Sequence, residues 1–204
     1  MKTGIVILAA GESARMGEPK QLLIFHGETL LQHAIATALE FCKTPVVVLG
    51  AHADEIRAQL DGTRILIAEN PDWLDGMGGS LRLGLGALLR AHQEVSGVIF
   101  MPCDLPLLTD ATLRDLIAAH ESTGYGIAAS EYAGVLGAPA YFSCEHFPEL
   151  LTLDGTVGAR QMIWRHRASA IGVPFPEGAM DMDTPSDYAR LRESHRELST
   201  HITV

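Results

Sequence analysis

The stretch Leu8-Ala9-Ala10-Gly11-Glu12-Ser13-Ala14-Arg15-Met16-Gly17-Glu18-Pro19-Lys20 directly follows an apolar run at residues 4–8. The uninterrupted Ile and Val of that run predict a strand covered on both faces, as in parallel sheets. The glycines of the loop permit conformations and close approaches that a β-carbon blocks, so amide N–H groups can face an anion. Two cations add charge that glycine cannot supply. The glycines are Gly11 and Gly17 and the cations are Arg15 and Lys20, which together predict a polyphosphate-binding loop.

The spacing within this loop argues against two common phosphate-binding motifs. Lys20 is preceded by Glu18-Pro19 and followed by Gln21, so the hydroxyl that binds magnesium in a Walker A loop is missing. The pattern is also not Gly-x-Gly-x-x-Gly, which weakens a dinucleotide-binding interpretation. The loop therefore predicts a polyphosphate site of another kind.

Strand-like apolar segments recur along the chain and alternate with segments of helical periodicity. They are residues 4–8, 45–50, 64–68, 97–101, 125–130 and 168–173. This pattern predicts an α/β protein of three layers, Rossmann-like, with a mostly parallel sheet and helices on both faces. One helix is expected from Thr29, whose spacing to Gln32 matches a capping box, and another from Ser80. Glycines between Tyr132 and Phe142 predict a small inserted hairpin, as a lid or a wall of the pocket.

Composition narrows the class of protein. The 204 residues, 47% of them hydrophobic, suit a single domain over residues 1–204, with a partly frayed tail at 192–204. A net charge of -10 argues against a nucleic-acid binder, which needs many cations. Three scattered cysteines, interpreted as small buried hydrophobes, favour a reducing cytoplasm. There is no signal-peptide pattern and no apolar run of about 20 residues, so a cytoplasmic protein without a membrane partner is expected.

Acidic residues follow two other segments. Asp104 comes directly after the strand at 97–101, and Asp183 precedes a helix start with Thr184 as N-cap and Asp187 as N3. Ligands of open parallel sheets bind outside the carboxyl ends of the strands, so Asp104, Asp183 and the glycine loop are expected at one edge. Two carboxylates beside a polyphosphate repel it unless a hard cation lies between them. We therefore predict one Mg²⁺ bridged by Asp104 and Asp183; a turn or cap role is the alternative for Asp104.

A second glycine-rich turn, residues 70–80, opens the helix expected at Ser80. Its amide groups and the helix N-terminus can hold a base edge, a ribose or a phosphate. Alternatively, Gly78 and Gly79 only permit a tight connection, and Trp73 is interpreted as a core residue. Arg160, which follows a loop at 154–159, either steadies an acceptor phosphate or is an ordinary surface arginine.

Taken together, these segments resemble the MobA-like nucleotidyltransferase family and, within it, the branch of molybdenum cofactor cytidylyltransferases. The branch is serine-rich where this chain has Gly78 and Gly79. The resemblance implies a Rossmann-like sheet, Mg²⁺ dependence, and transfer of a nucleoside monophosphate from an NTP with release of pyrophosphate. The matching residues are Leu8-Ala9-Ala10-Gly11, Arg15-Met16-Gly17, Pro19-Lys20-Gln21-Leu22-Leu23, Gly76-Met77, Ser80-Leu81, Asp104-Leu105-Pro106-Leu107, Gly158-Ala159-Arg160, Asp183-Thr184-Pro185 and Asp187-Tyr188.

The resemblance also implies roles for individual residues. Lys20 would hold the reacting or leaving phosphates, Arg15 the pyrophosphate, and Asp104 with Asp183 the metal, while Arg160 would lie on the acceptor side. The nucleotide would be bound by Leu8, Ala9, Ala10, Gly11, Arg15, Gly17, Lys20, Gly76 and Ser80.

The branch implies CTP and molybdenum-bound molybdopterin as substrates. The product is a cytosine dinucleotide cofactor used by molybdenum hydroxylases, and it would pass to such an enzyme or to its maturation chaperone. Ala10 favours CTP over GTP by the same analogy. Two alternatives stay open. One is transfer to a sugar or polyol phosphate, or GTP-dependent guanylyl transfer; the other is a nucleotide-binding module without chemistry.

Overall fold

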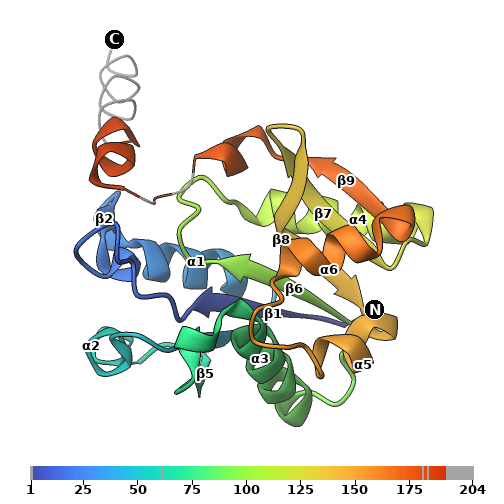
Figure 1. Cartoon of the computed structure of the whole chain (residues 1–204), viewed down its shortest axis with the longest axis horizontal. Helices are drawn as coiled ribbons and strands as arrows, with labels where there is room; N and C mark the ends of the chain where they lie inside the picture. Colours follow the sequence, from blue (N-terminus) through green and yellow to red (C-terminus); the bar gives the residue numbers. More distant parts are fainter. Residues whose placement is uncertain (1, 61, 181, 183, 192–204) are drawn as a thin grey trace.

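The computed structural model describes residues 2–60, 62–180, 182 and 184–191. Its strands are β1 (Thr3–Ala9), β2 (Ile24–Phe25), β3 (Glu28–Thr29), β4 (Val46–Leu49), β5 (Leu66–Glu69), β6 (Gly97–Pro102), β7 (Ile127–Tyr132), β8 (Val135–Ser143) and β9 (Ala170–Pro174). Seven of them form one sheet in the order β5-β4-β1-β6-β8-β7-β9, while β2 and β3 pair separately (Figure 1). Within the large sheet, β8 runs antiparallel to both of its neighbours, and the other adjacent pairs are parallel. The expected α/β class with a mostly parallel sheet is confirmed.

Helices cover both faces of this sheet. The α-helices are α1 (Leu30–Leu39), α2 (Ala53–Arg57), α3 (Met77–Ala91), α4 (Asp110–Thr123), α5 (Phe147–Leu150) and α6 (Ala159–Arg165). Short 3₁₀ segments are η1 (Lys20–Leu22), η2 (Trp73–Asp75), η3 (Cys144–His146), η4 (Arg167–Ser169) and η5 (Pro176–Ala179). None of the helices among the described residues has both the length and the apolar character needed to cross a membrane.

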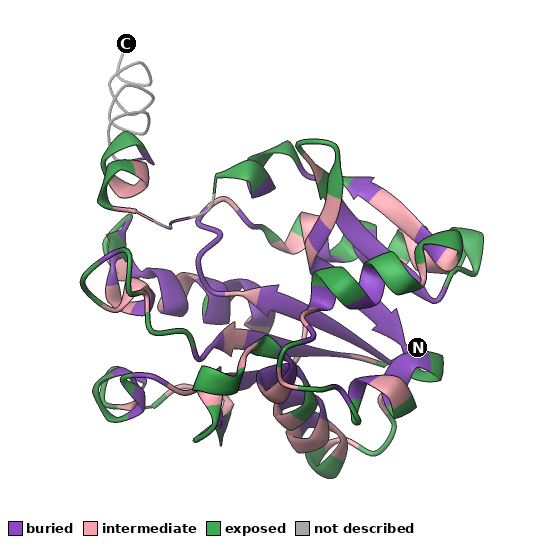
Figure 2. Ribbon diagram, in the orientation of Figure 1, coloured by how far each residue is buried: buried purple, intermediate pink, exposed green. Residues whose placement is uncertain are grey.

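The core is divided into two parts by the sheet, as the purple strands between helices show in Figure 2. Successive residues of a strand point to opposite faces. Ile99 of β6 therefore packs on the side of α1, α2 and α4, and Phe100 on the side of α3, α5 and α6. Both residues are fully buried. This explains the continuous apolar runs in the sequence, because each strand needs apolar residues on both faces.

Two local predictions concern helix starts. α1 begins after Thr29, whose Oγ1 accepts a hydrogen bond from the backbone N–H of Gln32 at 3.1 Å, while the Gln32 side chain accepts one from the Thr29 N–H at 2.9 Å. The capping box is thus confirmed. α3 begins at Met77 rather than at Ser80, because the glycines before Ser80 already have helical conformation.

The hairpin expected between Tyr132 and Phe142 exists, but it belongs to the central sheet. Its second strand, β8, lies between β6 and β7, and Phe142 pairs with Val98 of β6. The adjacent Ala140 and Tyr141 are fully buried. The apolar residues of this segment are therefore buried within the sheet, and the hairpin is not an exposed lid.

A third, smaller apolar cluster joins the loop after β1 to the C-terminal part of the described chain. It contains Met16, Phe25 and Met182, and Tyr188 packs against it. The hydroxyl of Tyr188 also donates a hydrogen bond to the carbonyl of Ile24 at 2.7 Å. Asp183 and the tail at 192–204, for which a metal role and fraying were predicted, lie outside the described residues.

Candidate active site

Lys20 and Asp104 meet at the carboxyl ends of neighbouring strands. β1 and β6 are in register so that Leu8 lies beside Pro102, and the two loops that follow leave the sheet together. The Nζ of Lys20 donates to Oδ2 of Asp104, with only 20% and 11% of the two side chains exposed. A cation and an acid that are far apart in the sequence are therefore brought together at this edge of the sheet.

Beside this ion pair lies a pocket of about 310 Å³, which is within the range of pockets that hold small ligands. It is bounded by the loop after β1, the end of β6, the start of α3 and parts of β8 and α6. Eight of the residues predicted to bind nucleotide or metal line it: Leu8, Ala9, Ala10, Gly11, Lys20, Gly76, Ser80 and Asp104.

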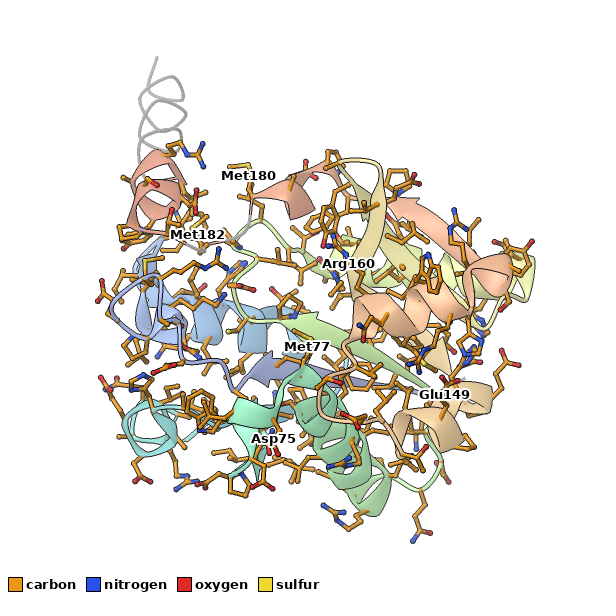
Figure 3. All side chains as sticks on the ribbon, viewed as in Figure 1. Asp75, Met77, Glu149, Arg160, Met180 and Met182 are labelled. Carbon is orange, nitrogen blue, oxygen red and sulfur yellow. The ribbon has the colours of Figure 1, made fainter. Side chains whose placement is uncertain are left out.

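Other predicted residues lie elsewhere. Arg15 and Gly17 are exposed and are not among the residues that line the pocket. Arg160, labelled in Figure 3, follows Ala159, which does line the pocket. The Arg160 side chain itself borders a neighbouring groove, which Trp164 also lines. Asp183 lies outside the described residues.

Gln21 is the most informative residue that the sequence analysis did not single out for the site. It is 1% exposed, and its Nε2 donates hydrogen bonds to the carbonyls of Ala9 and Gly11, both at 2.9 Å. These bonds tie the end of the loop to the end of β1. Gln21 stands in the motif Pro19-Lys20-Gln21-Leu22-Leu23 that carries the family resemblance, but nothing in the sequence indicated that its side chain is buried, because polar residues in loops are common.

The backbone of the loop uses left-handed conformations, though not all where expected. Gly17 has a φ of 80°, which glycine readily adopts, and Ser13, which is not a glycine, has a φ of 60°. The Ser13 Oγ accepts a hydrogen bond from the Lys20 N–H at 3.1 Å. A β-carbon on Gly11 would meet nothing within 4 Å, so the protein itself does not require glycine there. That glycine lets a ligand approach the backbone at position 11 stays a prediction.

Five further pocket residues were not predicted to bind: Trp73, Met77, Pro102, Cys103 and Ala138. Trp73 is half-buried against the core beneath α3, as a core residue would be, and it also borders the pocket. Ala138 belongs to the predicted hairpin and reaches the pocket because β8 inserts next to β6, so the hairpin forms part of the wall of the pocket, which is one of the two roles predicted for it. That insertion depends on strand order, which local sequence does not encode.

The glycine-rich turn before α3 makes a close backbone contact with a second loop. Gly76 has a φ of 115°, and the N–H of Gly78 donates to the carbonyl of Gly155 at 2.8 Å. A β-carbon on Gly78 would lie 1.9 Å from the carbonyl oxygen of Asp154. The tight-connection interpretation of these glycines therefore accounts for Gly78, and the contact positions the turn that borders the pocket.

Electrostatics at the pocket favour an anion. The N-terminus of the fifteen-residue helix α3, with Gly76, Met77 and Ser80, faces the pocket (Figure 3, Met77). Helix N-termini carry partial positive charge and unpaired N–H donors. The Ser80 Oγ accepts a hydrogen bond from Nδ2 of Asn70 at 3.0 Å, which fixes the hydroxyl on the first turn.

Cys103, next to Asp104, is held in its neutral form. Burial, assisted by the negative charge of Asp104, raises the pKa of the Cys103 thiol to about 12, while Lys20 opposes this shift. Reactive cysteines have lowered pKa values and exposed sulfur atoms. Cys103 therefore serves as an apolar wall, as expected for a small buried hydrophobe.

The donors present suit a hard divalent cation bound together with a phosphate. The Asp104 carboxylate offers oxygen ligands, which Mg²⁺ and Mn²⁺ prefer, and the pocket provides space for phosphate oxygens. Lys20 offers a cation for the same phosphates. The arrangement can thus bind and polarise a polyphosphate at the end of an apolar pocket.

Comparison with known proteins agrees with this chemistry. Residues 5–170 match the family described as the MobA-like NTP transferase domain. The chain is 25% identical over 194 residues to the molybdenum cofactor cytidylyltransferase of Escherichia coli (strain K12), covering 95% of this chain and 97% of that one. It is 34% identical over 165 residues to the nicotine blue oxidoreductase of Paenarthrobacter nicotinovorans, covering 76% and 78%.

A solved structure with the same fold is that of Rv0371c from Mycobacterium tuberculosis H37Rv. It has a TM-score of 0.75 and 34% sequence identity, covering 94% of this chain and 97% of that one. A second crystal structure of Rv0371c, in complex with manganese, has a TM-score of 0.70 and 31% identity over 95% and 100% of the chains. Because the family match spans most of the sheet and the whole lined edge of the pocket, the chain belongs to the MobA-like NTP transferase domain family and is a nucleotidyltransferase.

Proposed function

We propose that this protein transfers CMP from CTP to the terminal phosphate of molybdenum-bound molybdopterin, in the cytoplasm and with Mg²⁺, as a single domain that occupies the whole chain. The observation that carries the proposal is the pocket in which Lys20, Asp104 and the start of α3 meet. The likeness to the E. coli cytidylyltransferase, which extends over nearly the whole of both chains, supports the choice of CTP and of the acceptor.

In this proposal the triphosphate lies along the loop after β1. Lys20 holds the phosphates at which the reaction takes place, and the glycine at position 11 lets them approach the backbone. The cytidine moiety occupies the part of the pocket bounded by Ala10, Gly76 and Ser80, where N–H and hydroxyl groups can contact the base and the ribose. Arg15, which is exposed at the rim of the loop, contacts the pyrophosphate as it leaves.

The metal ligands in this proposal are Asp104 and Asp183. Asp104 is hydrogen-bonded to Lys20 in the ligand-free protein, so both groups already lie at the site: Asp104 would offer oxygen ligands to the metal, and Lys20 would offer its ammonium to a phosphate. Met182, which directly precedes Asp183 in the sequence, is buried in one cluster with Met16 of the loop after β1. This supports a role for Asp183 at the same site. When bound, Mg²⁺ would neutralise charge on the phosphates during transfer.

The reaction itself is an in-line displacement at the α-phosphorus. An oxygen of the acceptor phosphate forms the new P–O bond, the bond to the β-phosphate oxygen breaks, and pyrophosphate leaves with the electron pair. A phosphate oxygen is already ionised, so no strong base is required. The contribution of the protein is positioning and charge neutralisation by Lys20 and Arg15.

The acceptor would enter over the start of α6. Arg160 and Arg167 border the groove next to the pocket, together with the exposed Trp164. Two cations beside an exposed aromatic ring suit a phosphorylated ring system, because the cations contact the phosphate and the ring stacks. This supports molybdopterin over a sugar or polyol phosphate, which has no planar ring to stack.

One relative suggests a second candidate, since it carries the name of an oxidoreductase. In that case the pocket would hold a reduced nicotinamide cofactor rather than an NTP. The Lys20–Asp104 pair favours the transferase, because hydride transfer does not need a metal-binding carboxylate at the phosphates.

A binding and turnover panel tests the proposal. The four NTPs and NADPH are titrated calorimetrically with and without Mg²⁺, and pyrophosphate release is then measured with molybdenum-bound molybdopterin and with sugar and polyol phosphates. We expect CTP to bind only in the presence of Mg²⁺. We also expect pyrophosphate release with molybdenum-bound molybdopterin and not with the sugar or polyol phosphates. Preference for GTP, turnover with a sugar phosphate, binding of NADPH, or NTP binding without turnover on any acceptor would each contradict the proposal and identify the alternative.

A further inference from the structure

Two histidines and a glutamate cluster away from the nucleotide pocket. A ring nitrogen of His146, a ring nitrogen of His166 and a carboxylate oxygen of Glu149 all lie within 4.8 Å of one another. Nε2 of His166 is hydrogen-bonded to Oε2 of Glu149 at 2.6 Å, and the two imidazole rings are 4.7 Å apart. The residues come from η3, α5 and the end of α6, so the fold rather than one helix assembles the group.

His146 is the buried member of this cluster. Only 7% of the residue is exposed, and its Nε2 is a buried atom without a hydrogen-bond partner among the described residues. The nearest acid, Oε1 of Glu145, lies 3.5 Å away. A β-carbon on Gly126 would come within 2.6 Å of the same nitrogen, so a glycine there leaves it space. Buried polar atoms are normally paired, and an unpaired one calls for an explanation.

The cluster lies at the end of the sheet opposite the nucleotide pocket. β8 runs antiparallel to β6, so Ser143, just before η3, pairs with Gly97 at the start of β6. The pocket lies past Pro102 at the other end, roughly 16 Å away along the strand. Figure 3 shows Glu149 far from Met182. Occupancy of one site therefore does not require ligands from the other.

We propose that His146, Glu149 and His166 bind a divalent transition-metal ion of the Zn²⁺ type. Two imidazoles and one carboxylate suit such ions better than they suit Mg²⁺, because Mg²⁺ selects oxygen ligands. Three protein ligands leave a fourth position for water. Arg165, 3.5 Å from Oε1 of Glu149, balances the acid in the metal-free protein.

Such an ion would clamp the two ends of one segment. Glu149 and His166 are 17 residues apart, and between them lies the loop at 154–158 that contacts the glycine turn of the nucleotide pocket. A metal bond between the ends restricts the segment without touching the pocket. We therefore expect slower amide hydrogen exchange at residues 151–158 when the metal is bound.

The test uses the full-length protein without a histidine tag, stripped of metal with EDTA and kept in excess Mg²⁺ so that the oxygen-ligand site is occupied. Zn²⁺ is titrated calorimetrically, and ¹⁵N spectra of the histidine rings are recorded. We expect one Zn²⁺ per chain, shifts of the ring nitrogens of His146 and His166, and a raised Tm. His166→Gln and Glu149→Gln, at partly exposed positions that tolerate change, should weaken binding by more than the roughly 10- to 100-fold seen when only an outer partner is lost.

Two variants serve as controls. His92→Gln changes a partly exposed histidine outside the cluster, and Asp104→Asn changes the carboxylate of the nucleotide pocket; both should bind Zn²⁺ as the unchanged protein does. The proposal is overturned if Zn²⁺ binds no more tightly to the unchanged protein than to His166→Gln. It is equally overturned if Asp104→Asn abolishes the binding, or if other histidines shift instead.

Discussion

The ammonium of Lys20 and the carboxylate of Asp104, 84 residues apart in the sequence, form an ion pair across the ends of β1 and β6. Each side chain neutralises the other in the ligand-free protein, and each has the charge that a metal–nucleotide complex needs. A preformed pair keeps both groups in place, so little side-chain entropy is lost when the ligand arrives. We therefore expect the pair to affect folding and turnover separately.

Lys20→Ala should lower pyrophosphate release by roughly 10²- to 10³-fold, which is typical for loss of one electrostatic contact to the transition state. It should also lower the free energy of unfolding by about 1–3 kcal/mol, because the poorly exposed carboxylate of Asp104 loses its donor. Turnover and urea unfolding measure the two effects.

The double variant Lys20→Ala/Asp104→Asn separates the effect on turnover from the effect on stability. Removing the unpaired charge should return most of the lost stability, while activity stays low because both groups are absent. Recovery of activity in the double variant, or full activity in Lys20→Ala, would show that the pair is only structural.

Gln21 should be needed for the shape of the loop rather than for chemistry. Gln21→Leu keeps the size but removes both donors, which leaves the carbonyls of Ala9 and Gly11 unpaired and costs about 1–3 kcal/mol of stability. We expect KM for the nucleotide to rise more than kcat falls, as steady-state kinetics would show. Gln161→Leu, at an exposed position of α6, is the control and should leave KM unchanged. A selective fall in kcat for Gln21→Leu would instead place Gln21 at the reacting groups.

Local sequence was sufficient where short-range chemistry decides the structure. The strand before the loop, the capping box of Thr29 and the glycine at position 17 each depend on neighbours in the chain. The convergence of Lys20 and Asp104 could also be predicted, because carboxyl ends of parallel strands share one edge. The order of the strands in the sheet could not be predicted in this way. The insertion of β8 beside β6, and with it the lining of the pocket by Ala138, depends on long-range pairing.

The direction in which loop side chains point could not be predicted from the sequence either. Arg15 and Lys20 are both loop cations in the sequence, yet only Lys20 lines the pocket, because η1 and the Ser13 and Gln21 hydrogen bonds turn it inward. Likewise, His146 and His166 lie 20 positions apart with no metal-binding spacing. Their meeting follows from the packing of α5 and α6 on the same face of the sheet.

Gly78 should tolerate no side chain. In Gly78→Ala the new β-carbon would lie 1.9 Å from the backbone oxygen of Asp154, so the loop at 154–158 must move, at a cost of about 1–3 kcal/mol. Because Gly76, Met77 and Ser80 border the pocket, nucleotide affinity should fall as well. Thermal unfolding and nucleotide titration check both effects.

Gly86→Ala is the matched control for Gly78, since it lies on the same helix and its β-carbon would approach only the flexible Arg90 side chain, at 3.3 Å. Helix propensity predicts a gain of about 0.5–1 kcal/mol there, with unchanged nucleotide affinity. Equal effects of the two substitutions would mean that the contact with the second loop does not position the turn.

The three cysteines should differ sharply in reactivity toward iodoacetamide in the metal-free protein. The thiolate is the reacting form, and a pKa of about 12 leaves roughly one Cys103 in 10⁴ ionised at pH 8. Burial also raises the pKa of Cys42, whereas Cys144 is exposed. Mass spectrometry should therefore find Cys144 modified first. Cys144→Ser should remove the fast phase. Rapid labelling of Cys103 at pH 8 would mean that the end of β6 opens to solvent.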